Sequence, residues 1–255
     1  MKKIVITQSI EQMKDFVTLA NGINAEVIVF PVIKVVPLPI THQLKHIFYN
    51  VQAYDWIIFT SINSVRYFFY VLMNQFLKLP GGKPQIACMG EKTVQTLKTY
   101  GKSPDFFLPD QSLSDFYRSF IKTNKVTESH QVLIPVSQQE LSGMEDIRIA
   151  SCQCRFLPIF ETQMNTFIPA PQIAQVKNTE DLIITFFTPP AFENFIKIIP
   201  VKEFNKGWDL IAGGADTENL MLQHGVHHLY KAEQAKSDVV FEIVKNLLDT
   251  RAEKG

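Results

Sequence analysis

The stretch IACMGEKTVQTLKTYG, residues 86–101, passes from an apolar run through a glycine into a segment with helical spacing. We predict a strand over 85–89, a turn at Gly90, and a helix that reaches Tyr100 with Gly101 as its cap. A strand followed by a turn and a helix of about ten residues is typical of parallel α/β units with right-handed crossovers.

The same spacing returns in the second half of the chain, and in both halves seven residues separate the threonine from the next glycine. The two copies are Gly90-x-x-Thr93 with Gly101, and Gly214-x-x-Thr217 with Gly225. Upstream of each copy, a buried strand ends in Phe59-Thr60 or in Phe187-Thr188 and is followed by a helix. Downstream of each copy, an amphipathic helix begins with good N-cap residues, at Ser114-Asp115 or at Ser237-Asp238. Four matched elements in one order predict two α/β domains of similar topology that face each other.

Hydrophobic periodicity predicts another strand and helix in the N-terminal half of the chain. Tyr54–Phe59 is predicted to be a buried strand. The helix after it places apolar residues at helical spacing, namely Val65, Phe68, Phe69, Leu72 and Phe76. We also expect a helix over Ile10–Asn21 that ends at Gly22 in a left-handed cap, and a polar helix around 138–148.

Two β-rich segments, near 31–39 and 156–164, are interrupted by prolines. Proline is tolerated at strand ends and sheet edges but not in the middle of a sheet. These segments are therefore predicted to be the crossing points between the domains. If both cross, one domain is discontinuous in sequence.

Composition excludes several classes of function. Lysine plus arginine and aspartate plus glutamate number 25 each, so the formal net charge is zero and no global positive field would recruit nucleic acid or membrane. No apolar run approaches the roughly 18 residues of a membrane-spanning helix. Three cysteines fit a reducing compartment, and we expect a cytoplasmic protein; nothing in the sequence demands more than a monomer.

Motifs for metals and common cofactors are missing. Cys152-Gln153-Cys154 has neither the spacing nor the partner pair of a zinc site, and His227 and His228 are predicted on a strand, where neighbours point to opposite faces. The sequence also has no G-x-S-x-G, no Walker loop, no dinucleotide-binding glycine fingerprint and no H-E-x-x-H. We expect no metal site.

The candidate site consists of polar residues at the strand-to-helix turns. The first N–H groups of a helix lack partners and the helix dipole is positive there, so a carboxylate or phosphate is stabilised. Hydroxyl and amide groups add donors at the same depth, from Thr60, Ser61, Asn63, Thr93, Thr188 and Thr217. Together they predict a cleft for an acidic ligand, and the alternative for each of them is a helix-capping role.

Six segments in one order carry a resemblance to a known family. They are YDWIIFTSINSV, IACMGEKTVQTLKTYG, VLIP, ITFFTPP, the second glycine-threonine turn and SDVVFEIV. Over nearly its whole length the chain resembles the uroporphyrinogen-III synthase family. The resemblance implies two flavodoxin-like parallel-sheet domains facing each other and joined by a two-stranded β connector, with residues 1–35 and 163–255 in a discontinuous domain and 36–162 in an inserted one.

The resemblance also implies a reaction. Linear hydroxymethylbilane closes to uroporphyrinogen III with inversion of ring D and loss of water, and no cofactor is expected. Thr60 and Ser61 match the family's Thr-Ser turn, Thr93 and Thr217 match its two glycine-threonine turns, and Thr188 stands where the family often has serine. These residues would bind and orient substrate carboxylates, with Lys92 as a candidate helper.

Three departures from the family pattern concern the chemistry. Thr7-Gln8 replaces the usual Thr-Arg, and the basic pair expected after VLIP is missing from VSQQELSG. Phe160 replaces a connector tyrosine whose hydroxyl is the family's candidate for assisting hydroxyl loss, so no catalytic residue is assigned. Either positioning of the substrate suffices, a nearby tyrosine supplies the donor, or the protein is slow.

Two other functions are alternatives to this lyase. A non-catalytic binder of acidic tetrapyrroles or other small anions agrees with the lost polar residues. An enzyme that uses NAD or a nucleotide would need the glycine loop that the sequence lacks.

Overall fold

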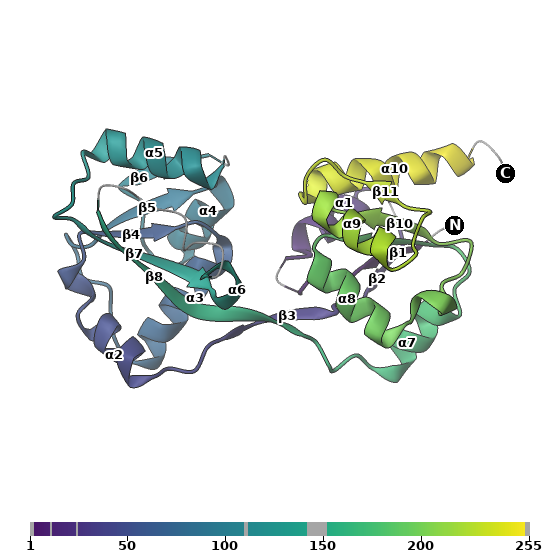
Figure 1. Cartoon of the computed structure of the whole chain (residues 1–255), viewed down its shortest axis with the longest axis horizontal. Helices are drawn as coiled ribbons and strands as arrows, with labels where there is room; N and C mark the ends of the chain where they lie inside the picture. Colours follow the sequence, from purple (N-terminus) through teal and green to yellow (C-terminus); the bar gives the residue numbers. More distant parts are fainter. Residues whose placement is uncertain (1–2, 11, 24, 110–111, 142–151, 253–255) are drawn as a thin grey trace. The chain divides into compact units, whose positions relative to one another are not determined.

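A computed structural model describes residues 3–10, 12–23, 25–109, 112–141 and 152–252. Internal contacts divide the chain into two compact units. One consists of Met1–Val35 with Gln163–Gly255 and is called the terminal unit below; the other is Val36–Thr162 and is called the inserted unit. Figure 1 shows a β-sheet with helices around it in each.

The terminal unit is a five-stranded sheet in the order β11-β10-β9-β1-β2, and each neighbouring pair is parallel. Its strands are β1 (Lys3–Ile6), β2 (Val27–Val29), β9 (Leu182–Phe186), β10 (Asp209–Ala212) and β11 (Tyr230–Lys231). Its helices are α1 (Lys14–Asn21), α7 (Ala170–Lys177), α8 (Pro189–Ile198), α9 (Ala215–Gln223), α10 (Ser237–Ala252) and the 3₁₀ turn η2 (Val201–Glu203).

The pleat of the terminal sheet divides its apolar residues between two cores. On β1, Val5 packs with α7, α8 and α9, whereas Ile4 and Ile6 pack with α1 and α10. Successive side chains of a strand point to opposite faces, so a strand buried on both faces reads as a continuous apolar run. This explains why KIVI and LIITF show no polar alternation.

The inserted unit is a six-stranded sheet in the order β3-β8-β7-β4-β5-β6. Its strands are β4 (Trp56–Phe59), β5 (Gln85–Met89), β6 (Phe106–Leu108) and β7 (Gln131–Ser137), together with β3 (Ile33–Pro37) and β8 (Gln153–Met164), which both run past the boundary into the terminal unit. Its helices are α2 (His42–Tyr49), α3 (Ile62–Asn74), α4 (Glu91–Thr99), α5 (Leu113–Asn124), α6 (Gln138–Leu141) and the 3₁₀ turn η1 (Val51–Ala53). The pairs from β8 through β7, β4 and β5 to β6 are parallel.

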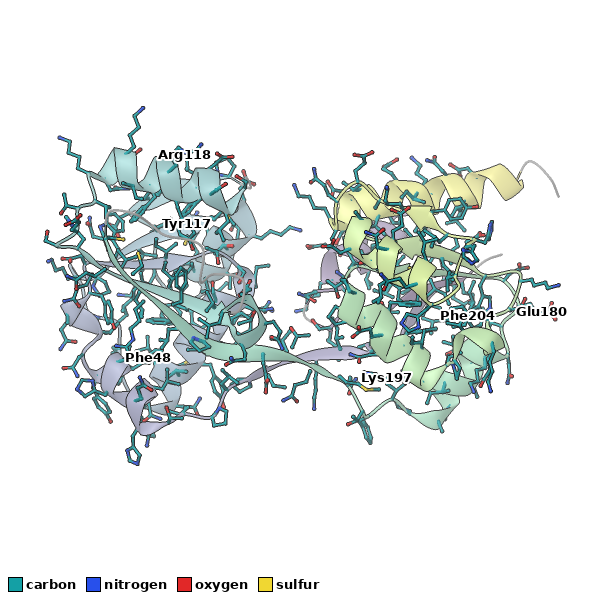
Figure 2. The ribbon with its side chains drawn as sticks, in the orientation of Figure 1. Phe48, Tyr117, Arg118, Glu180, Lys197 and Phe204 are labelled. Atoms are coloured by element: carbon teal, nitrogen blue, oxygen red, sulfur yellow. The ribbon has the colours of Figure 1, made fainter. Side chains whose placement is uncertain are left out.

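Aromatic residues fill both faces of the inserted sheet. Tyr117 of α5 packs on the side that Ile58 faces, and Phe48 of α2 packs against Phe68, which contacts Phe59 on the other side (Figure 2). Ile58 and Phe59 are consecutive, so their side chains leave the sheet in opposite directions. Both faces are therefore covered by helices, as a parallel sheet requires.

The two proline-bearing segments form a pair of strands. β3 lies at the edge of its sheet, as its prolines predict, whereas β8 contains Pro158 and yet lies between β3 and β7, so the edge expectation is wrong for the second segment. The N–H of Leu38 donates to the carbonyl of Ile159 at 3.0 Å, and the N–H of Asn165 donates to the carbonyl of Val32 at 2.9 Å. Residue numbers thus rise on one strand as they fall on the other, so the pair is antiparallel.

Four sequence-based expectations about helices are wrong. α1 begins at Lys14 rather than Ile10, and Gly22 has φ −63°, which is right-handed, so this helix does not end in a left-handed cap. α3 ends at Asn74, and Phe76 lies beyond it with its side chain 97% exposed. The N-cap of α5 is Ser112, two residues before the predicted Ser114.

The remaining differences lie in loops and at the boundary of the described residues. His227 and His228 precede β11 and lie on no strand. α6 covers only Gln138–Leu141, and the rest of the helix predicted over 138–148 lies outside the described residues. None of the helices described here is long and apolar enough to cross a membrane.

Candidate functional site

In the inserted unit, the turn after β4 and the turn after β5 lie at the same edge of the sheet. β4 and β5 are parallel neighbours, with Phe59 opposite Cys88, so the residues that follow both strands emerge at the carboxyl edge. We call Thr60, Ser61, Asn63 and Thr93 the inserted edge. Ligands of open parallel sheets bind at this edge because helix N-termini gather there.

Ser61 serves as the N-cap of α3 in a reciprocal capping box. Its hydroxyl accepts the N–H of Ser64 at 3.1 Å, and the Ser64 hydroxyl accepts the N–H of Ser61 at 3.2 Å. The capping alternative is therefore confirmed as one role of Ser61. The N–H groups of Ile62 and Asn63, the first two of the helix, have no hydrogen-bond partner among the described residues.

The two glycine-threonine turns place matching residues at matching helix positions, although the backbone of the glycine differs, with φ 85° at Gly90 and 167° at Gly214. Gly90 and Gly214 are the N-caps of α4 and α9, and neither helix has a side-chain cap. Thr93 and Thr217 are each the third residue of their helix, with side chains 4% and 2% exposed. The glycines eight residues further on, Gly101 and Gly225, both have positive φ, at 69° and 80°.

The hydroxyl groups of these two threonines have no hydrogen-bond partner in the described part of the chain, and neither oxygen is fully enclosed. A nearly buried threonine whose hydroxyl reaches the surface beside an uncapped helix start offers one donor together with the first N–H groups. The first turns also carry acids, Glu91 on α4 and Asp216 with Glu218 on α9. Lys231 neutralises Glu218 at 3.0 Å, which limits the repulsion of an anion there.

In the terminal unit, Thr188 and Thr217 follow the neighbouring strands β9 and β10. Thr188 is the N-cap of α8, is exposed and makes no side-chain cap hydrogen bond. Pro189 and Pro190 follow it, so the first two N–H groups of α8 do not exist, and the N–H of Ala191 donates to the Thr188 carbonyl at 3.0 Å. The expectation that helix N–H groups bind an anion at every turn is therefore wrong for α8, which offers a hydroxyl instead.

The N-cap position also corrects the internal alignment of the two halves. Ser61 is the N-cap of α3 and Thr188 is the N-cap of α8, whereas Thr60 lies one residue earlier. The structural counterpart of Thr188 is thus Ser61 and not Thr60. The Phe-Thr match misled because β9 is followed by one more phenylalanine, Phe187, before the turn.

The sequence missed how close β1 would lie to this turn. β1 pairs with β9, so Thr7, Gln8 and Ser9 emerge beside Thr188. The Thr7 hydroxyl donates to the Thr185 carbonyl at 2.6 Å, whereas the side-chain oxygen of Gln8, a residue 9% exposed, is buried with no hydrogen-bond partner among the residues that the structure describes. We call Thr7, Gln8, Thr188 and Thr217 the terminal edge; no sequence signal gave the order of its strands.

Gly213 allows the strand ends of the terminal edge to lie close together. Its N–H donates to the carbonyl of Phe186 at 2.7 Å. A Cβ atom on Gly213 would lie 2.8 Å from the Cα of Phe187, closer than real Cβ contacts come. Glycine is therefore required for backbone packing at this position, a role that the sequence alone did not indicate.

The position of the missing connector tyrosine is occupied by a buried phenyl ring. Phe160 is 4% exposed, lies opposite Ser137 at the end of β7, and stacks on Tyr67 of α3 with ring centroids 5.2 Å apart and an angle of 18° between the planes. Lys92 is the second residue of α4 and is exposed. It therefore lies beside Thr93 at the inserted edge.

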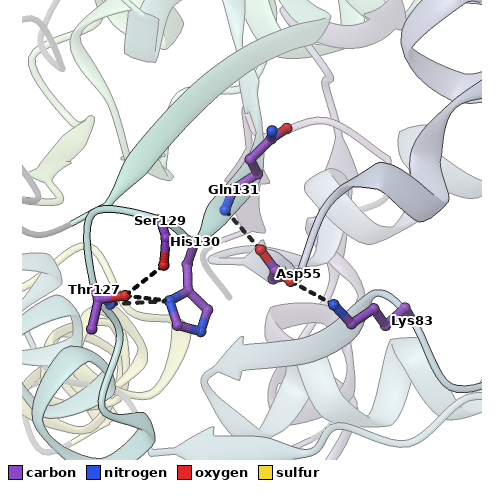
Figure 3. Close-up of polar contacts among 6 residues, drawn as sticks. All are labelled: Asp55, Lys83, Thr127, Ser129, His130 and Gln131. Carbon is purple, nitrogen blue, oxygen red and sulfur yellow. Dashed lines mark hydrogen bonds and ion pairs between the residues drawn. The ribbon is translucent and has the colours of Figure 1, made fainter.

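The charged network of the inserted unit lies at the opposite edge of the sheet, where the strands begin (Figure 3). Asp55 binds Lys83 at 2.7 Å and accepts the N–H of Gln131 at 2.9 Å, and these two hydrogen bonds lower the pKa of its carboxyl group. It joins the starts of β4, β5 and β7, because the N–H of Gln85 also donates to its carbonyl. A shifted pKa in this place indicates a structural carboxylate.

A cavity of about 320 Å³ in the inserted unit shares no residue with the inserted edge. Apolar side chains form most of its wall, with Arg155 and Thr41 among the polar ones. Across the described residues, no group of three or more His, Cys, Asp or Glu side chains could hold a metal ion. Burial raises the pKa of the Cys88 thiol to about 12, so this cysteine is an inert core residue.

Comparisons with known proteins agree with this architecture. The family model for uroporphyrinogen-III synthase HemD matches residues 14–242. A Methanocaldococcus jannaschii protein named "Putative uroporphyrinogen-III synthase" is 32% identical over 200 residues, which cover 77% of this chain and 78% of that protein. The uroporphyrinogen-III synthase of Synechococcus elongatus is 22% identical over 78% of this chain and 75% of its own.

Solved structures show the same fold. The crystal structure of uroporphyrinogen-III synthetase from Helicobacter pylori aligns with a TM-score of 0.63 at 16% identity, and covers 97% of this chain and 100% of that one. At this identity the likeness concerns the fold alone. The family model spans most of the chain, and the chain therefore belongs to the uroporphyrinogen-III synthase family.

Proposed function

We propose that this chain closes hydroxymethylbilane to uroporphyrinogen III with inversion of ring D and loss of water. The observation that carries the proposal is the match to the uroporphyrinogen-III synthase family over residues 14–242. The curated relatives and the fold agree with it, and none of the comparisons favours the non-catalytic binder. The reaction needs no redox step, so the chain's own residues can supply what it requires.

Binding in this proposal depends on local donors because the chain has no net charge. The substrate carries eight carboxylates. Each of the two edges offers donors to carboxylates of this kind, through the N–H groups at the starts of α3, α4 and α9 and through the hydroxyls of Thr93, Thr188 and Thr217. Ser61 contributes by holding the start of α3, and Thr60, Asn63 and Lys92 complete the donors of the inserted edge.

The chemistry starts with departure of the terminal hydroxyl group, which leaves an electrophilic azafulvene. The substituted carbon of ring D attacks it and forms a spiro intermediate, which fragments and closes again with that ring inverted. Uncatalysed closure gives the uninverted isomer, so the enzyme must hold a flexible chain in the geometry that favours attack by the substituted carbon. Positioning of this kind supplies a large part of a rate enhancement, up to roughly 7–11 kcal/mol in favourable cases.

The decisive experiment supplies hydroxymethylbilane freshly made by its synthase and separates the uroporphyrin isomers after oxidation. We expect isomer III to form faster than the spontaneous closure. Isomer I alone, at the spontaneous rate, would refute the lyase and leave the binder of acidic tetrapyrroles. A monomeric state and a cytoplasmic location are part of the proposal, and sedimentation and cell fractionation test them.

A further inference from the structure

We propose that Tyr67 supplies the hydroxyl group that Phe160 lacks, and that it protonates the departing hydroxyl of the substrate. The inference rests on the proposed function. Hydroxide is a poor leaving group, and a phenol, with an ordinary pKa of about 10, can donate a proton to it as it leaves. The question is which phenol of the chain lies where the connector tyrosine would have been.

The ring of Tyr67 lies directly on the ring of Phe160. The centroids are 5.2 Å apart and the planes differ by 18°, so the two six-membered rings stack almost in parallel. Tyr67 is therefore a phenol in direct ring contact with position 160.

Secondary structure places this pair at the inserted edge. Phe160 pairs with Ser137 at the end of β7, after the irregularity between Val136 and Ser137. Tyr67 lies in the second turn of α3, the helix that begins at the inserted edge and packs against β7. Phe160 is 4% exposed and Tyr67 is half-buried, so Tyr67 is the ring of the pair that a substrate can reach.

Three other tyrosines of this unit are placed less well. Tyr117 is 3% exposed on the α5 side of the sheet, and burial raises its pKa, so it is a poor proton donor. Tyr100 stacks on Phe69, with ring centroids 4.4 Å apart, rather than on Phe160. Tyr70 is 41% exposed and packs edge-to-face with Tyr67, with the two ring centroids 6.3 Å apart. It therefore serves as a matched control on the same helix.

The proton balance of the step closes within the substrate and Tyr67. The carbon–oxygen bond of the hydroxymethyl group breaks with its electron pair on oxygen, which takes the phenol proton and leaves as water. The positive charge is carried by the azafulvene nitrogen, beside the phenolate. When the macrocycle closes, the ring D carbon loses a proton, and the phenolate takes it back.

The test compares Tyr67→Phe and Tyr70→Phe with the parent in the isomer assay. Phenylalanine keeps the stacked ring, so thermal unfolding should be unchanged within about 2 °C. We expect Tyr67→Phe to lower kcat by roughly 100-fold or more, as for loss of a general acid, with more isomer I from spontaneous closure, and Tyr70→Phe to lower it by less than about 3-fold.

The second arm asks whether the hydroxyl can be moved to the neighbouring ring. We expect the double variant Tyr67→Phe with Phe160→Tyr to have a kcat at least about 10-fold higher than that of Tyr67→Phe alone. A purely structural role of Tyr67 would not produce this result. An active parent with a fully active Tyr67→Phe variant overturns the assignment alone, and so does a loss that Phe160→Tyr does not restore. A parent that yields only isomer I refutes the proposed function and this assignment together.

Discussion

Replacing Thr217 by valine removes a hydroxyl group from a nearly buried side chain without changing its shape. Thr217 is 2% exposed, and its hydroxyl has no partner among the described residues. The variant should therefore fold with a free energy of unfolding within about 1 kcal/mol of the parent, because no protein hydrogen bond is lost. The same reasoning applies to Thr93, which is 4% exposed at the corresponding position of α4.

The effect on catalysis should be larger than the effect on stability. A hydrogen bond to a charged group contributes about 1.5–3 kcal/mol, and each 1.4 kcal/mol is a factor of ten. If Thr217 donates to a substrate carboxylate, Thr217→Val should lower kcat/KM by roughly 10- to 150-fold. A loss confined to KM would indicate uniform binding, whereas an equal loss in kcat and kcat/KM would indicate an interaction made only in the transition state.

Initial rates with fresh hydroxymethylbilane, measured by isomer separation, give kcat and KM for each variant. Thr96→Val is the matched control. Thr96 lies one turn beyond Thr93 on α4, the helix that corresponds to α9, and its hydroxyl donates to the Lys92 carbonyl at 2.8 Å. The kcat/KM of Thr96→Val should stay within about 3-fold of the parent's value. A Thr217→Val variant as active as the parent would remove this turn from the site, and an equally slow Thr96→Val would show a general effect of threonine loss.

Three further predictions concern stability. Asp55→Asn should lower the free energy of unfolding by about 1 kcal/mol at pH 7. The pKa of Asp55 is lowered in the folded state, so its stabilising contribution is present above about pH 4 and is lost as the pH falls through the folded-state pKa. Urea unfolding should therefore give the parent and the variant the same free energy of unfolding in acid. Ser61→Ala should cost about 1 kcal/mol by breaking the capping box, and an unchanged melting temperature would contradict that role. Gly213→Ala should destabilise the protein by about 1–3 kcal/mol in thermal unfolding, because the new Cβ meets the backbone of Phe187; a melting temperature equal to the parent's would show that the strands can separate at no cost.

Local pattern was sufficient for most elements near the site. The strand, turn and helix around Gly90 and around Gly214 were predicted from spacing, and the structure confirms the same N-cap and the same left-handed glycine in both. Parallel α/β architecture followed from the alternation of such units. These features depend on hydrogen bonds and steric limits within a few residues, which short-range sequence patterns record.

Helix ends were predicted less well, because competing signals lie close together in the chain. Helical spacing continues to Phe76, yet α3 ends at Asn74. Ser112 and Ser114 are both good N-caps, and only the structure selects Ser112. Pro189 and Pro190 were visible in the sequence, but their consequence for an anion site requires knowing that they are the first two residues of α8.

The sequence by itself determined the family, the repeated glycine-threonine turns and the residue types at the candidate edges. Only the tertiary structure decided that Thr7 and Gln8, which follow β1, lie beside Thr188, and that Tyr67 stacks on Phe160. Strand order and ring stacking join residues far apart in the chain, and such contacts arise from packing of whole elements, which no local periodicity encodes. For this reason the sequence left open which hydroxyl group could replace the missing one, and the stacked pair on α3 and β8 provides a specific candidate.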